Sequence, residues 1–176
     1  YWGDEYYSPD PKSEKNKNRV ANIKRVNLKR RARSDAIIFF LGVIDNMGQL
    51  NEVMWHYHLK HLENDKRREL WRAFCDLPNI DKIESRQHEN IHLNEHSLTS
   101  YSADQVLKLL GINFSKTKLK KFSSKKRPQN KELVQLVLSA VKSNPKAYKE
   151  TLDLYIKYWI EDYELREEKT RSKASN

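Results

Sequence analysis

Three histidines in the segment HENIHLNEH, residues 88 to 96, have a spacing that could bind zinc. His88, Glu89 and His92 form a His-Glu-x-x-His pattern, and His96 follows four residues later. On a helix these histidines lie one turn apart on one face, where two imidazoles can hold zinc while the glutamate acts as general base. The pattern therefore raises the hypothesis of a zinc-dependent hydrolase.

The residues around this pattern do not suit a catalytic zinc site. Apolar flanks normally bury such a helix and orient the ligands, but the flanks here are ESRQ and NEH, with only Ile91 and Leu93 apolar. Zincins place their third ligand farther on than His96, and metzincins need a glycine turn that the sequence lacks. The sequence also lacks a Gly-rich phosphate loop and a G-x-S-x-G elbow. We expect a protein that is not an enzyme, with no catalytic residue, metal ligand or cofactor, and keep the zinc hydrolase as a remote alternative.

The positive charge of the chain is concentrated in two short segments. The net charge is +10, of which residues 12–33 contribute +9 and residues 116–131 contribute +8, so subtracting both leaves −7 for all other residues. Segregated charge of this kind creates a local field that attracts polyanions. We therefore expect both segments to contact phosphates of a nucleic acid. The candidate residues are Lys24, Arg25, Lys29, Arg30, Arg31 and Arg33 in the first segment and Lys116, Lys118, Lys120, Lys121, Lys125, Lys126 and Arg127 in the second.

The first basic segment has the pattern of an amphipathic helix. Val20, Ile23 and Val26, with Asn27, fall on one side of such a helix, and the basic residues point outward. Arginines are concentrated near its end, and a guanidinium can donate two hydrogen bonds to one phosphate. The runs KRRAR and KKRP also resemble nuclear import signals, so we expect a nuclear location in a eukaryote and a cytoplasmic one otherwise.

The second basic segment follows a short helix and resembles the second half of a helix-turn-helix. Ser102 and Gln105 form a capping box, Gly111 ends the helix, and Leu119 and Phe122 supply an inward face for a second helix. The resemblance covers only about twenty-five residues, and a solvated lysine-rich loop is the alternative reading. Neither segment has aromatic residues interleaved for stacking single-stranded bases, which favours duplex DNA as the partner.

The rest of the sequence predicts an all-α fold of helical hairpins packed as one small bundle. Four glycines, five prolines and few β-branched runs favour helices over a sheet rich in turns. Cys75 is the single cysteine, which excludes an intramolecular disulfide, and we expect it to be buried on a helix. The expected parts are a mobile, disordered N-terminal arm (1–18), a helical domain (19–165) and a frayed tail (166–176). Within the domain we expect a hairpin capped by Ser34 (35–64), a short helix (66–77), a connector (79–101), the helix-turn-helix-like segment (102–122) and a second hairpin (130–165).

A protein-interaction module is the alternative to a nucleic-acid-binding module. The acidic and aromatic start of the chain, YWGDEYY, resembles a short docking peptide, which favours a protein partner and a place in a larger assembly. The longest apolar run, Ala36 to Ile44, is shorter than the roughly 20 residues that cross a bilayer, so no membrane is expected as partner. The sequence thus favours a duplex-DNA-binding module, with a helical scaffold domain as the alternative.

Overall fold

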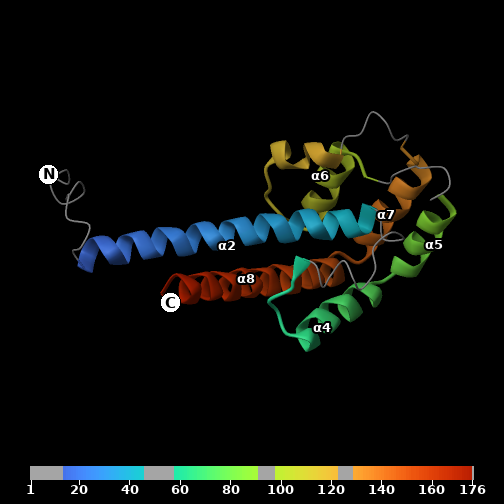
Figure 1. Ribbon diagram of the computed structural model, residues 1–176. Coiled ribbons are helices and arrows are strands. Elements are labelled where there is room, and N and C mark those ends of the chain that lie inside the picture. The colour runs from blue at the N-terminus through green and yellow to red at the C-terminus, as the bar shows by residue number, and fades with distance from the viewer. Residues whose placement is uncertain (1–13, 46–57, 91–97, 123–128, 176) are drawn as a thin grey trace, which may run out of the picture.

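A computed structural model describes residues 14–45, 58–90, 98–122 and 129–175 of the chain (Figure 1). Every element in these ranges is a helix, so the all-α prediction is confirmed. The elements are α2 (Glu14–Asp45), α4 (Asn64–Cys75), α5 (Ile80–Asn90), α6 (Ser100–Leu109), the 3₁₀-helix η3 (Lys116–Phe122), α7 (Lys131–Ser143) and α8 (Pro145–Ser175).

Two long helices, α2 and α8, run antiparallel and pack on one another (Figure 1). Their shared core contains Phe40 of α2 and Tyr155 of α8, whose ring centroids are 5.2 Å apart in an edge-to-face arrangement. Phe74 of α4 lies 6.0 Å from Phe40 and completes this aromatic cluster. The shorter helices pack around the same end of the pair: α4 contacts α8, α5 and α6 contact α7, and η3 contacts α6.

Helix α2 differs from the predicted arm and hairpin, because it is one continuous helix from Glu14 to Asp45. Residues 14–18, expected in the mobile arm, form its first turn. Ser34, expected as an N-cap, lies mid-helix and is 9% exposed. The physical reason is that no glycine or proline occurs between residues 14 and 41, so nothing ends the helix where the composition changes from basic to apolar.

Helix α8 also continues beyond its predicted end. The sequence predicts a frayed tail over 166–176, but α8 extends to Ser175. Asn144 separates α7 from α8, which begins at Pro145, and α8 packs mainly on α2 and less on α7. The segment predicted as a second hairpin (130–165) forms two successive helices that contact each other, and the aromatic face of α8 also covers the apolar half of α2.

The connector predicted over residues 79–101 contains a further helix. Asn79 has a φ of 65°, a left-handed conformation that asparagine tolerates and that separates α4 from α5. Ile80 and Ile83, one turn apart on α5, are 2% and 0% exposed, and α5 packs on α7 and α4. Burial against α7 and α4 thus stabilises a helix in this segment, although its own apolar periodicity is weak.

Helix α6 lies where the sequence places it, with a different cap. Thr99 is the N-cap, and its Oγ1 accepts from the Ser102 backbone N–H at 3.2 Å. The Ser102 hydroxyl accepts in return from the Thr99 N–H at 2.7 Å, so Ser102 occupies the third position of the capping box instead of its first. Gly111, with a φ of 70°, follows the helix end as predicted.

Two other predictions concern residues before and within α4. Most of the second helix of the first hairpin falls in 46–57, outside the described residues, and residues 59–62, expected at its end, form a turn. Helix α4 confirms the short helix predicted before Pro78.

Cys75 is exposed, so the expectation that it is buried is wrong.

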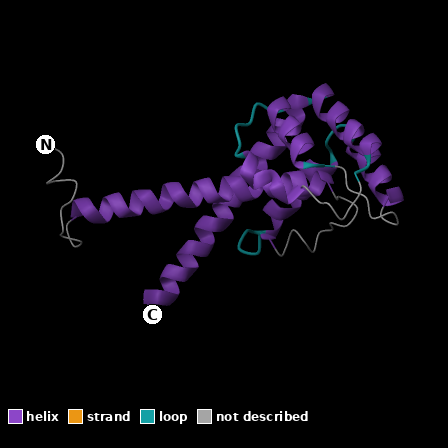
Figure 2. Cartoon of the chain, turned by 90° about the horizontal axis from the view of Figure 1, so that it is seen from above, coloured by secondary structure: helices purple, strands orange, loops and turns teal. Residues whose placement is uncertain are grey.

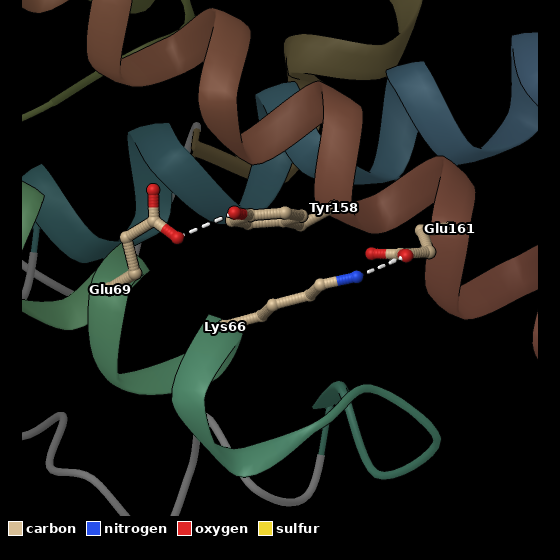
Figure 3. Close-up of polar contacts among 4 residues, drawn as sticks. All are labelled: Lys66, Glu69, Tyr158 and Glu161. Atoms are coloured by element: carbon tan, nitrogen blue, oxygen red, sulfur yellow. Dashed lines mark hydrogen bonds and ion pairs between the residues drawn. The ribbon is translucent and has the colours of Figure 1, made fainter.

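A polar seam joins α4 to α8 (Figure 3). The Tyr158 hydroxyl donates to a Glu69 carboxylate oxygen at 2.5 Å, and Lys66 forms an ion pair with Glu161. The hydrogen bond to Glu69, together with partial burial, raises the pKa of Tyr158 to about 12. The pKa of Lys66 is raised by its hydrogen bond to Glu161. These contacts fix α4 against the middle of α8.

Candidate nucleic-acid interface

The N-terminal part of α2 projects from the rest of the molecule (Figure 2). All residues from 17 to 27 are exposed, whereas Leu28 and Ala32 begin the buried face. With 32 residues, α2 is about 48 Å long at 1.5 Å per residue. Residues 14–31 are called the projecting half of α2 below, and all of them except Asn16 and Leu28 are exposed. Figure 2 also shows that the C-terminal end of α8 diverges from this half, so the two helices do not cover each other there.

The predicted basic residues of the first segment all lie on this helix. Lys24, Arg25, Lys29, Arg30 and Arg31 are exposed, and Arg33 is half-buried. With 100° of rotation per residue, the five exposed side chains leave α2 in directions all around the axis. These candidate residues therefore lie on all sides of one helix and do not form a single basic face.

Two of these arginines have local partners. Arg25 donates to the Asn22 side-chain oxygen at 3.0 Å. The Arg31 guanidinium lies 5.7 Å from the centre of the Tyr163 ring of α8, a cation–π contact where the two helices begin to diverge. Arg31 and Arg33 thus border the packed part of the molecule, while Lys24, Lys29 and Arg30 extend into solvent.

The second basic segment meets α2 at the base of the projecting half. The Lys118 ammonium group donates to the Ser34 hydroxyl at 2.8 Å, although the two residues are 84 positions apart in the sequence. Lys118 also lies 5.7 Å from the centre of the Phe114 ring. Lys116 and Lys120, its neighbours on η3, are exposed. The structure therefore brings the two basic segments side by side, with Lys118 partly occupied as the contact between them.

The second helix of the expected helix-turn-helix is different from the prediction. Leu119 and Phe122 face inward as expected, at 1% and 6% exposure. However, residues 116–122 form a 3₁₀-helix, which is only about 14 Å long at 2.0 Å per residue and poorly suited to reading a groove. Lysines crowded at positions 116, 118, 120 and 121 leave too few apolar residues for an α-helical face. The side chain of Lys121 and residues 125–127 lie outside the described part of the chain.

An apolar stripe accompanies the cations on the projecting half. Val20, Ile23 and Val26 are 47%, 53% and 52% exposed. Their spacing correctly predicts that they share one side of a helix, but no described element covers them. Aliphatic side chains at this spacing are typical of a helix that docks on a partner.

A pocket of about 450 Å³ lies between α2, residues 58–61 and α8. Its inner wall is aromatic: the Phe39 ring centroid is 4.8 Å from that of Trp159 and 4.7 Å from that of His58. Its polar lining includes Lys60 and Arg166, both exposed. Sequence patterns do not predict this pocket, because its lining residues come from three segments that are brought together only by tertiary packing.

The two acidic residues of the pocket are already engaged. Asp162 is 2% exposed, and one of its carboxylate oxygens accepts from the His61 backbone N–H at 2.9 Å. Asp35 accepts a hydrogen bond from the Tyr163 hydroxyl. Burial and this hydrogen bond raise the pKa of Tyr163 to about 12, although Arg166, 4.2 Å from the ring centre, acts in the opposite direction.

Three cations lie near the His61 ring of the pocket. The Lys169 ammonium group lies 3.2 Å from its Nδ1 atom. Burial lowers the pKa of His61, and the charges of Lys169, Lys60 and Arg166 lower it further, against the opposing effect of Asp162. The pocket thus combines three nearby cations, Lys60, Arg166 and Lys169, with the two carboxylates of Asp35 and Asp162.

The histidine motif falls mostly outside the described residues. The backbone of His88 and Glu89 belongs to the last turn of α5, which ends at Asn90, whereas His92 and His96 lie outside the described ranges. Residues 14–45, 58–90, 98–122 and 129–175 contain no group of three or more His, Cys, Asp or Glu side chains that could hold a metal ion. The same part of the chain contains no helix with the length and apolar character required to span a membrane.

Comparisons with protein-family models, with curated proteins and with solved structures find no match for this chain.

Proposed function

We propose that this chain binds duplex DNA through phosphate contacts, with the projecting half of α2 in the major groove. An α-helix with its side chains is about 10–12 Å across, which fits a major groove roughly 12 Å wide. Both walls of that groove present phosphates. The observation that carries the proposal is a solvated helix with cations on all sides, because such a helix can contact both walls at once.

The second basic segment supports the placement of the projecting half of α2 in the major groove. Lys118 holds η3 against Ser34, so Lys116 and Lys120 lie beside the point where α2 leaves the packed part of the molecule. A helix that enters a groove from this point would bring η3 near the adjacent phosphate backbone. We assign Lys116 and Lys120 to phosphate contact and Lys118 mainly to positioning η3.

The proposed geometry favours DNA over duplex RNA. The major groove of A-form RNA is deep and narrow, so a helix cannot lie in it as it would in the wider major groove of DNA. A chain that only gathers phosphates by charge would bind both duplexes with similar affinity. Competition between DNA and RNA duplexes of the same sequence therefore tests the position of α2, and we expect the DNA duplex to bind at least tenfold more tightly.

The direct test is fluorescence anisotropy of a labelled DNA duplex at several salt concentrations. The variant Lys24→Glu, Lys29→Glu, Arg30→Glu reverses three exposed charges on the projecting half and keeps good helix-forming residues. Each lost phosphate contact reduces the log–log salt slope by about 0.9, so we expect a reduction of about 2.7.

A matched control separates local contact from net charge. The variant Lys82→Glu, Lys142→Glu, Lys146→Glu reverses three exposed charges on α5, α7 and the start of α8, at the opposite end of the molecule (Figure 1). This control should keep the salt slope within about one contact of the unmodified chain. Equal losses in both variants, or no saturable binding by the unmodified chain at low salt, would refute the proposal.

The apolar stripe favours a second candidate function, docking of a partner protein. Val20→Gln, Ile23→Gln and Val26→Gln together remove the stripe without changing charge. If the projecting half works through phosphates, this variant keeps its duplex affinity, measured by the same anisotropy titration. A loss of duplex affinity in a fully helical variant would contradict a purely phosphate-based mode and assign the stripe to the interface itself.

A further inference from the structure

The pocket between α2, residues 58–61 and α8 combines an apolar body with exposed charged side chains. Its volume of about 450 Å³ falls within the roughly 300–1,000 Å³ of small-molecule sites. The half-buried Phe39 forms the inner wall, and Trp159, which is 3% exposed, packs against Phe39. Lys60 and Arg166 are exposed and line the same pocket.

The charges in and beside this pocket are only slightly in favour of an anionic ligand, because Lys60, Arg166 and the adjacent Lys169 carry three positive charges against the two negative charges of Asp35 and Asp162. Asp35 and Asp162 are the acidic lining residues, and each already accepts a hydrogen bond, from Tyr163 and from the His61 backbone respectively. Lys60 and Arg166 are joined by Lys169, which contacts the His61 ring. A ligand would therefore meet cations at the mouth and rings inside.

We infer that this pocket binds a nucleotide, with the base against the half-buried Phe39 ring, on which Trp159 packs, and the phosphate against Lys60 and Arg166. Planar bases gain from aromatic contact, and a guanidinium can donate two hydrogen bonds to a phosphate. The ligand is either a free nucleotide or an unpaired nucleotide of a bound strand. The second possibility rests on the proposed function, and the contact of Arg31 with Tyr163 places the pocket beside the projecting half of α2.

The first experiment is a titration of the whole chain with adenosine monophosphate, followed by NMR of the histidine side chains. We expect saturable shifts at His61 and His58, and binding at least tenfold weaker for adenosine or for inorganic phosphate alone. Absence of saturable shifts with the nucleotide would overturn the inference. Equal binding of nucleotide and phosphate would overturn it as well, since the aromatic wall would then contribute nothing.

A variant tests the mouth of the pocket. Lys60→Gln with Arg166→Gln should weaken nucleotide binding at least tenfold, whereas the control Lys142→Gln with Lys146→Gln should not. Thermal unfolding of the variant checks that it is folded. If it is unfolded, the comparison of nucleotide, adenosine and phosphate on the unmodified chain decides the question without it.

A second arm distinguishes the two sources of the nucleotide. If the ligand is a nucleotide of a bound strand, a duplex with one unpaired 3′ nucleotide should bind more tightly than a blunt duplex. This difference in affinity should disappear in the Lys60→Gln, Arg166→Gln variant. Equal affinity of the two duplexes, with nucleotide binding retained, assigns the pocket to a free nucleotide.

The two proposals fail in distinguishable ways. The variant Lys24→Glu, Lys29→Glu, Arg30→Glu should lose duplex binding and keep nucleotide binding, since none of its three positions lines the pocket. Retained duplex binding without nucleotide binding refutes the pocket alone. Nucleotide binding without any duplex binding refutes the proposed function and leaves the pocket as a free-nucleotide site.

Discussion

The two halves of α2 belong to one uninterrupted helix and have opposite environments. In the packed half, Ala32, Ala36, Ile37 and Phe40 are fully buried against α8 and its neighbours. In the projecting half, Val20, Ile23 and Val26 occupy similar helical spacing and remain about half exposed. Apolar periodicity thus specifies a helix but not its burial, which requires a second apolar surface opposite.

The largest expected difference between the halves is in stability. Phe40→Ala removes a fully buried ring that contacts Phe74 and Tyr155, and should lower the free energy of unfolding by about 3–5 kcal/mol. Ile23→Ala, at 53% exposure, should change it by less than about 0.5 kcal/mol. Urea unfolding followed by circular dichroism measures both. A large loss for Ile23→Ala would show that the projecting half is buried in solution by another copy or segment.

A smaller effect is expected where α8 leaves the packed part of the molecule. Asp162→Ala leaves the partly buried His61 backbone N–H without its acceptor, which should cost about 1–3 kcal/mol of unfolding free energy. Asp162→Asn is the matched control, because its amide oxygen can still accept that bond and its size is nearly unchanged. Urea unfolding of both variants should rank alanine as the less stable, and equal stability would mean that the bond contributes nothing.

A third effect depends on pH and concerns the seam between α4 and α8. The pKa of Tyr158 is about 12 in the folded chain and about 10 in an unfolded one. Between these values the unfolded state releases the proton first, so stability is present below pH 10 and is lost as the pH rises toward 12. Tyr158→Phe should cost about 0.5–1.5 kcal/mol at pH 8, through the lost bond to Glu69, and reduce this alkaline loss.

The measurement is the urea midpoint at pH 8, 10 and 11. Tyr101→Phe is the matched control, because the Tyr101 side chain is 73% exposed on α6. The control should lose stability with pH as the unmodified chain does. A Tyr158→Phe variant that loses as much stability between pH 10 and 11 as the unmodified chain would contradict the assigned role of the hydrogen bond.

The smallest effect is expected in the pocket. Burial and the charges of Lys169, Lys60 and Arg166, opposed by Asp162, lower the folded-state pKa of His61. The unfolded state therefore takes up a proton first on acidification, and stability declines as the pH falls through about 6.5. His61→Gln should remove part of this loss of stability. The thermal unfolding midpoint of the variant should therefore fall less between pH 7.5 and pH 5.5 than that of the unmodified chain. An unchanged shift in the variant would exclude His61 as its cause.

Local sequence patterns account for the helical class and for many of the helix boundaries. Apolar spacing predicts the buried faces of α7 and α8, Gly111 marks the end of α6, and Asn144 with Pro145 separates the last two helices. These features depend on neighbouring residues along the chain, so local chemistry suffices. Both basic segments are likewise evident from the distribution of charge along the chain.

The pairing of the helices and the surfaces left open depend on tertiary packing. The pairing of α2 with α8, the helical state of α5 and the contact of Lys118 with Ser34 join residues far apart in the sequence. The same is true of the pocket around Trp159. Such contacts depend on matching surfaces across the whole chain, and the free energy of burying them overrides weak local preferences. That is why one half of α2 is part of the core while the other, equally helical, is exposed.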